Sequence, residues 1–380
     1  MPASLREWRR PHSQPGRARE TRRPNPVSCL SVTHRKRGIW SRATIGAAAL
    51  AAMAVVAAAG CAPTAPASRT AADASVQHDL SIAEAKAAYA SYLTESDAAA
   101  AQGDETTGLE FVADAEWAQV KAQYTALASA GIPVPRYQYS AARFYVPAEN
   151  KYPQWFLVSA QRRTDTNGHL GSAVTTLLVF EHAKAGRVWT LNGSVTLARG
   201  EKLPTIAESA AGYAVDLPTT DTSLLVPPNV VGPTQAAVVD QGADNPAAAL
   251  TGRGPLTTGL HAAQAAQARA ETARRLQYQW LLEGVPFPQF ELGLADGGAL
   301  VLYGMALNTT TEHPNLVPGS PIPVPAAVTP LLAAPNEVGY HAVFADWTYE
   351  FAAIDPPATA HNAKIDVIAG TPGPTTGHAY

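Results

Sequence analysis

The amino-acid sequence predicts an α+β protein in which two tandem units each place helices before a bent antiparallel sheet. Apolar residues first recur at helical spacing and then switch to the two-residue alternation of strands, and this order returns in the second half of the chain. The chain has 380 residues, more than a typical single domain, and 46% of them are hydrophobic. We expect the two units to follow an N-terminal signal helix and a flexible tether.

The expected segments follow from changes in composition along the chain. Residues 1–60 are predicted to be a signal peptide region that is removed, and residues 61–80 a lipidated N-terminus and flexible tether. The first α+β domain would span residues 81–200, and a proline-containing connector residues 201–234. The second α+β domain would span residues 235–380, with a proline-rich insertion at 311–335 and a flexible C-terminal tail.

Two helices are predicted at the start of the first unit. Ser81-Ile82-Ala83-Glu84 has the pattern of a capping box, so we expect a helix over residues 81–101. A second apolar stripe indicates a helix over 111–130, which Gly131 and Pro133 would end.

The pattern then changes to that of strands, with the hairpin signal Asn167-Gly168 between two of them. The expected strands are residues 137–146, 154–163, 172–181 and 187–198.

The second unit is predicted to repeat this order. A short helix is expected within residues 235–250 and a longer one over 258–282, in which Glu271 and Arg275 would pair across one turn. The expected strands are residues 289–294, 299–307, 341–354 and 364–369.

The N-terminal segment has the pattern of an export signal. A positive cluster that ends at Arg42 precedes an apolar run from Ala47 to Gly60, which is shorter than the roughly 20 residues of a spanning helix. The run ends at Ala58-Ala59-Gly60-Cys61, which resembles the bacterial lipobox. That resemblance implies cleavage between Gly60 and Cys61 and a diacylglycerol on the Cys61 thiol. Because residues 1–31 are long for such a signal, we also hypothesise a later translation start, near Val32.

A lipid on Cys61 would place the protein at the extracytoplasmic face of the cell membrane. Two or three acyl chains, palmitate among them, give stable anchoring, whereas a single chain binds only marginally. The stretch that follows is rich in Ala, Pro, Ser and Thr and is typical of a flexible tether.

Charge is distributed unevenly along the chain, although the net charge is only −3. Residues 1–60 contain eleven Lys and Arg against two Asp and Glu, and the remainder contains seventeen against 29. The acidic body has no basic run that would follow a phosphate backbone, so we expect no nucleic-acid partner.

A search for catalytic motifs assigns no catalytic, cofactor-binding or metal-ligating residue. The histidines that follow Cys61 lack metal-site spacing, and no G-x-S-x-G motif is present. The pairs Asp104/Glu105 and Asp114/Glu116 lie at predicted helix starts, where they complement the helix dipole. We therefore expect no cofactor.

Aromatic residues are concentrated on the predicted strands, where most of them would form the core. A concave sheet covered by a helix can also leave an apolar pocket at its wide end. His341, Asp346 and Trp347 are the candidate residues for such a pocket.

Helices followed by a bent sheet are also the order of the cone-shaped folds of the nuclear-transport-factor and cystatin type, which the exported part resembles in architecture. The lipobox and the composition together resemble those of an uncharacterised lipoprotein family of high-GC Gram-positive bacteria. This resemblance implies no particular activity.

From the sequence we therefore expect a membrane-anchored, non-catalytic binding or scaffolding protein of the cell envelope, whose partner is an envelope protein or a small apolar ligand. Two alternatives stay open. One is a small-ligand carrier or pocket enzyme that uses the concave sheet of one domain, and the other is a structural spacer.

Overall fold

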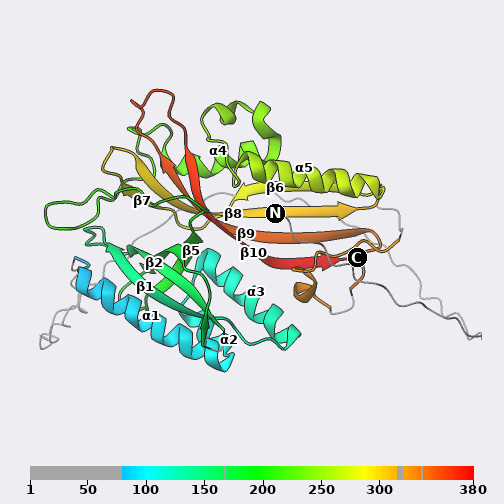
Figure 1. Ribbon diagram of the computed structural model, residues 1–380, viewed down its shortest axis with the longest axis horizontal. Helices are drawn as coiled ribbons and strands as arrows, with labels where there is room; N and C mark the ends of the chain where they lie inside the picture. Colours follow the sequence, from blue (N-terminus) through cyan, green and yellow to red (C-terminus); the bar gives the residue numbers. More distant parts are fainter. Residues whose placement is uncertain (1–78, 167, 315–319, 335–336) are drawn as a thin grey trace, which may run out of the picture. The chain divides into compact units, whose positions relative to one another are not determined.

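The computed structural model describes residues 79–166, 168–314, 320–334 and 337–380 (Figure 1). All of them belong to one unit of the chain, Arg69–Tyr380. The predicted signal region, Cys61 and the tether as far as residue 78 lie outside the described residues. In the described part, helices combine with two antiparallel sheets, which confirms the predicted α+β class.

Three helices open the described part. Helix α1 (Ile82–Gln102) begins with the predicted capping box, because the Ser81 hydroxyl accepts a hydrogen bond from the Glu84 amide at 3.1 Å while the Glu84 carboxylate accepts one from the Ser81 amide. Helix α2 (Glu105–Glu110) is short, and α3 (Asp114–Ala130) ends at Gly131 in the left-handed conformation. No helix of the described part is both long and apolar enough to cross a membrane.

The first sheet has five strands, and four of them correspond to the strands predicted in the first half of the chain. They are β1 (Arg136–Tyr145), β2 (Gln154–Thr166), β3 (His169–Leu170), β4 (Val174–His182) and β5 (Thr190–Thr196). The order is β1-β2-β4-β5, and β3 pairs with β2. Helix α1 packs against β1 (Figure 1).

The segment predicted as a connector, residues 201–234, lies against both sheets. Ile206 and Asp216 form bridges to Leu294 and Leu292 of the second half, and Ala214 bridges to Pro147 of the first half. The division of the chain at this connector stays a prediction.

Helix α4 (Pro228–Gln241) begins inside the predicted connector, so the expectation of one short helix within 235–250 is wrong about its start. The first helical position suits proline, because that residue needs no intrahelical donor. The interior Pro233 obscured the pattern, yet burial of Val231, Val238 and Val239 supports the helix. The short 3₁₀ helices η1 (Gly242–Asp244) and η2 (Pro246–Ala249) follow.

The predicted helix 258–282 is wrong beyond Ala273. Helix α5 (Thr258–Ala273) ends there, and β6 (Gln277–Gly284) follows. In β6 the side chains alternate between exposed and more buried positions, which is the period of a strand. Glu271 pairs with Arg274 at 3.1 Å instead of with Arg275, whose φ is 63° at the helix end.

The second sheet is built from long strands. Its members besides β6 are β7 (Phe290–Gly293), β8 (Ala299–Glu312), β9 (Ala342–Asp355) and β10 (Asp366–Ala379). The order is β10-β9-β8-β6, with β7 paired to β8. Helices α4 and α5 pack against β6 (Figure 1). The described part of the proline-rich excursion between β8 and β9 contains the 3₁₀ helix η4 (Thr329–Leu331).

Strand β10 replaces the flexible tail that we expected after residue 369. It continues to Ala379, and the Tyr380 amide donates to the Ala342 carbonyl at 3.1 Å. Pro372 and Pro374 are tolerated in this strand because β10 is an end strand of its sheet.

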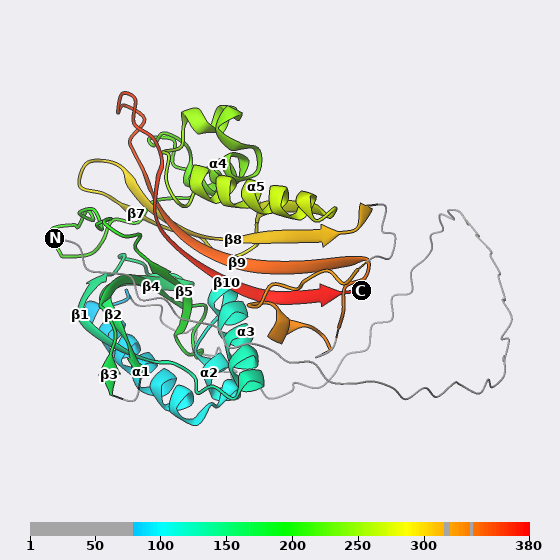
Figure 2. The ribbon, with the colours of Figure 1, turned by 45° about the vertical axis from the view of Figure 1, so that its right-hand side comes forward.

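The two sheets share one apolar core. Leu157 and Leu177 of the first sheet belong to the same buried cluster as Leu292, Leu300 and Ile368 of the second half. The backbones also join directly, because the Ala198 amide donates to the Ile368 carbonyl at 2.8 Å. Strands β5 and β10 therefore lie side by side at this end of the sheets (Figure 2).

This shared core predicts one cooperative unfolding transition. Leu157→Ala and Leu292→Ala each remove a fully buried side chain, one from either sheet, and each should lower the free energy of unfolding by about 2–5 kcal/mol. Thermal unfolding of the purified protein, followed by circular dichroism and tryptophan fluorescence, should show a single transition shifted in both variants. Ile132→Ala, at a position 55% exposed, is the control. Two transitions, only one of them shifted by Leu157→Ala, would contradict the shared core.

Candidate functional site

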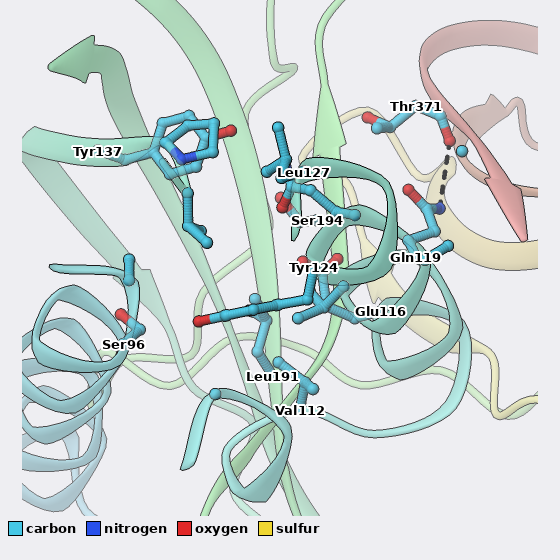
Figure 3. Close-up of a pocket in the computed structure, with 18 of the residues that line it drawn as sticks. Ser96, Val112, Glu116, Gln119, Tyr124, Leu127, Tyr137, Leu191, Ser194 and Thr371 are labelled. Atoms are coloured by element: carbon cyan, nitrogen blue, oxygen red, sulfur yellow. Dashed lines mark hydrogen bonds between the residues drawn. The ribbon is translucent and has the colours of Figure 1, made fainter. Parts of the chain in front are cut away.

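A cavity of about 440 Å³ is lined by residues of α1, α3, strands β1, β2 and β5, and β10. Figure 3 shows Ser96 of α1 on one side of it and Glu116 and Gln119 of α3 on the other, with Tyr124 and Leu191 between them. A cavity of this size can accommodate a small ligand.

Helix α3 is tied to the second sheet through Gln119. Its side-chain amide donates to the backbone carbonyls of Thr348, at 3.3 Å, and Thr371, at 3.5 Å (Figure 3). Gly373 makes this approach feasible, because a Cβ on that residue would lie 2.7 Å from the Gln119 carbonyl oxygen. The two sheets thus form the walls of one cavity.

Four tyrosines line the cavity: Tyr92, Tyr124, Tyr137 and Tyr139. Burial raises the pKa of Tyr92, Tyr124 and Tyr139, so these phenols stay protonated at neutral pH. Each one offers an O–H donor at the end of an apolar ring. The Tyr92 ring also meets the Phe180 ring edge-on, with centroids 5.2 Å apart, which holds it in place.

Arg162 brings a positive charge to the cavity from β2. Its guanidinium lies over the Tyr137 ring, 5.0 Å from the centroid, and Nη2 donates to the Thr196 hydroxyl at 3.1 Å. These two contacts orient the group. A guanidinium has five N–H donors in a planar fork that suits a carboxylate.

Two carboxyl groups lie close together at the wall. Glu116 lines the cavity, and its charge acts on Glu350, which is 3% exposed and does not itself line the cavity. The Ser194 amide donates to Glu350 Oε2 at 2.6 Å. Burial raises the pKa of both carboxyls, and the mutual repulsion of their charges raises that of Glu350 further. Both carboxyls therefore bind a proton more tightly than a carboxyl group in water does.

A second group of carboxyls lies where the connector meets both sheets. Burial raises the pKa of Glu149 to about 7, that of Asp216 to about 6 and that of Glu291 to about 8. The nearby Asp216 charge raises the pKa values of Glu149 and Glu291 further. Within the described ranges, no group of three His, Cys, Asp or Glu side chains has the geometry to hold a metal ion.

The three pocket residues predicted from the sequence do not line this cavity. His341 precedes β9, and its ring stacks on Tyr380 with centroids 5.9 Å apart. Asp346 accepts a hydrogen bond from the Thr376 hydroxyl, and Trp347 packs against the core beside α4 and α5. Neighbouring positions of a strand point to opposite faces, so Asp346 and Trp347 cannot share a pocket wall on one face. A pocket at these residues stays a prediction.

Sequence reasoning missed the carboxyl pair. It interpreted Glu116 as an acid at a helix start, which α3 confirms, since Glu116 lies in its first turn. Its neighbour Glu350 is itself buried and lies in a run of buried residues of β9. An ionisable residue in such a run is a signal that could have identified one member of the pair, although not the other.

The buried carboxyls predict that stability falls as pH rises. Glu149, Asp216 and Glu291, and also Asp355 with a pKa of about 7, bind protons more tightly in the folded protein than in the unfolded chain, where such groups titrate near 4. Their contribution is fully present below about pH 4 and is lost as pH rises through 6 to 8. Urea denaturation at pH 5, 7 and 9 should show a falling free energy of unfolding.

Glu291→Gln should reduce this pH dependence, because the amide does not ionise. The exposed Glu201→Gln is the matched control and should leave the pH dependence unchanged. Equal slopes in the wild type and Glu291→Gln would contradict the assignment.

Comparison with known proteins gives one related protein and one family. The chain is 27% identical over 218 residues to an uncharacterized lipoprotein of Streptomyces avermitilis, and the match covers 54% of this chain and 61% of the relative. The chain thus spans less than two thirds of that relative. No solved structure matches, so the expected likeness to nuclear-transport-factor or cystatin folds has no support from a structural relative.

The model of the family described as "Domain of unknown function (DUF8094)" matches residues 76–377. This range covers both sheets, the connector and the cavity. The chain therefore belongs to the DUF8094 family.

Proposed function

We propose that this protein is a lipid-anchored binding protein that holds a small amphipathic ligand in the cavity between α1, α3 and β10. The observation that carries the proposal is the lining of the cavity. Tyrosine rings and aliphatic side chains provide apolar walls, while Glu116, Arg162 and Gln119 supply polar groups at separate places. Apolar walls with a few placed polar groups are typical of ligand sites.

The cavity favours a ligand carrier over the scaffolding protein that the sequence alone suggested. A scaffold needs an outer surface for its partner, whereas these polar groups face inward. The two carboxyls also differ from a glycosidase pair, because only Glu116 lines the cavity, whereas the two glycosidase carboxyls flank the bond that is cleaved.

The lipid anchor is supported by two independent observations. Residues 58–61, Ala-Ala-Gly-Cys, resemble a lipobox, and the related Streptomyces avermitilis protein is named an uncharacterized lipoprotein. The family match begins at residue 76, so residues 62–75 lie between Cys61 and the matched region.

Filling the cavity should remove the ligand. Ala126 lines it from α3, so Ala126→Trp places an indole in the space, whereas Ala128→Trp puts the same side chain on an exposed position of that helix. Native mass spectrometry of protein extracted in mild detergent from the cells that make it should show a bound small molecule. The wild type and Ala128→Trp should retain it, and Ala126→Trp should lose it. The same bound mass in all three proteins, or none in the wild type, would contradict the proposal.

The anchor predicts that Cys61 alone takes up lipid. Cells fed an alkyne analogue of palmitate should label the wild type and Cys29→Ala but not Cys61→Ala, because only a thiol at the cleavage site forms the thioether. In-gel fluorescence after dye coupling measures this. Label on Cys61→Ala equal to that on the wild type would place the lipid elsewhere.

A further inference from the structure

Two opposite charges face the cavity without neutralising each other by direct contact. Glu116 and Arg162 both line it, and Arg162 lies near enough for its charge to lower the pKa of Glu116. Among the ion pairs of the described residues, the Asp97–Arg136 pair also lines the cavity, and none joins Glu116 to Arg162. The side chains of Glu116 and Arg162 are therefore separated from each other along the cavity wall.

Other contacts hold the two charges in their separate places. Glu116 lies beside Glu350, and the Glu350 carboxylate accepts a hydrogen bond from the Ser194 amide. Arg162 is held by the Thr196 hydroxyl and the face of Tyr137. Because each group already has a fixed position, closing the gap between them would require breaking these contacts.

Arg162 is prepared for an anionic group. The bond to Thr196 uses one N–H of Nη2, and the remaining edge of the fork can meet a carboxylate through paired N–H donors. The stack on Tyr137 fixes the plane of the guanidinium, so little side-chain entropy is lost when such a pair forms.

The carboxyl pair is prepared for a cationic group. Glu116 presents carboxyl oxygen acceptors to the cavity, and the nearby Arg162 charge favours its ionised form. An ammonium group brings only N–H donors, which is the complement of those acceptors. Tyr92 and Tyr139 line the same cavity and add aromatic surface to it.

We infer that the ligand is a small zwitterion of the amino-acid or short-peptide class, with its ammonium group at the Glu116–Glu350 pair and its carboxylate at Arg162. This inference rests on the proposed function, because it assigns the chemistry of the ligand in the same cavity. The apolar walls formed by Val120, Leu127 and Leu191 would contact the part of the ligand between or beside its charges. A ligand with only one of the two charges would leave the other protein charge without a partner.

Isothermal titration calorimetry of the purified protein tests the assignment. The probes are free amino acids, alanyl and phenylalanyl dipeptides, and the N-acetyl and C-terminal amide derivative of each. Acetylation removes the positive charge of the probe, and amidation removes its negative charge. We expect binding by at least one unblocked probe and a loss of about tenfold or more in affinity for each of its blocked forms.

Variants of the two charged residues give an internal control. Arg162→Gln should weaken the unblocked probe by about tenfold or more, yet it should leave the affinity of the amide derivative nearly unchanged, because the carboxylate is already absent there. Glu116→Gln should likewise weaken the unblocked probe by about tenfold or more, and it should leave the affinity of the acetyl derivative nearly unchanged, because the ammonium group is already absent there. The matched controls Arg163→Gln and Glu110→Gln change exposed charges outside the cavity and should behave like the wild type.

The outcomes separate this inference from the proposed function. Blocked probes that bind as tightly as unblocked ones overturn the zwitterion, and so does a panel in which no probe binds. In both cases the native mass spectrometry of the Ala126→Trp pair still decides whether the cavity holds a ligand. A bound molecule that lacks either charge would keep the binding protein and discard the zwitterion.

Discussion

The packing of two antiparallel sheets around one apolar core is the constraint on which the rest of the structure depends. Strands β5 and β10 meet at the bond between Ala198 and Ile368, and the side chains behind them form a single cluster. That joint brings α3 against both sheets, so Glu116 meets Glu350 and Gln119 reaches Thr371. The cavity is therefore a product of the way the two halves of the chain pack together. Its charged groups depend on this joint more than on any local motif.

Local patterns predicted the elements of this fold well. The capping box at Ser81 and the left-handed glycine at Gly131 act within a few residues, and the structure confirms both of them. The errors lie where a local signal opposed tertiary packing. Pro233 lies inside a helix whose valines are buried, and Trp280 lies on a strand although its spacing also suited a helix.

The candidate site could not be predicted in the same way, because its contacts join residues far apart in the chain. The bond from Gln119 to Thr371 spans 252 positions, and no spacing rule connects them. Glu116 lies in the first turn of a helix, where an acidic residue is favoured by the helix dipole. Because this local explanation sufficed, nothing in the sequence pointed to its proximity to Glu350. The predicted residues His341, Asp346 and Trp347 were chosen from one strand, whereas the cavity draws on both halves of the chain.

The prolines of β10 have a consequence for the behaviour of the protein among its own copies. The outer edge of a sheet is a template on which another chain can add a strand. Pro372 and Pro374 lie on this edge strand and have no backbone N–H to donate. Further along, Leu332 of the proline-rich excursion bridges to Gly377 and covers another part of it. The proposed lipid anchor would concentrate molecules on one membrane surface, where they would meet often and in similar orientations. An end strand that offers few donors and is partly covered would let them collide without forming a continuous sheet.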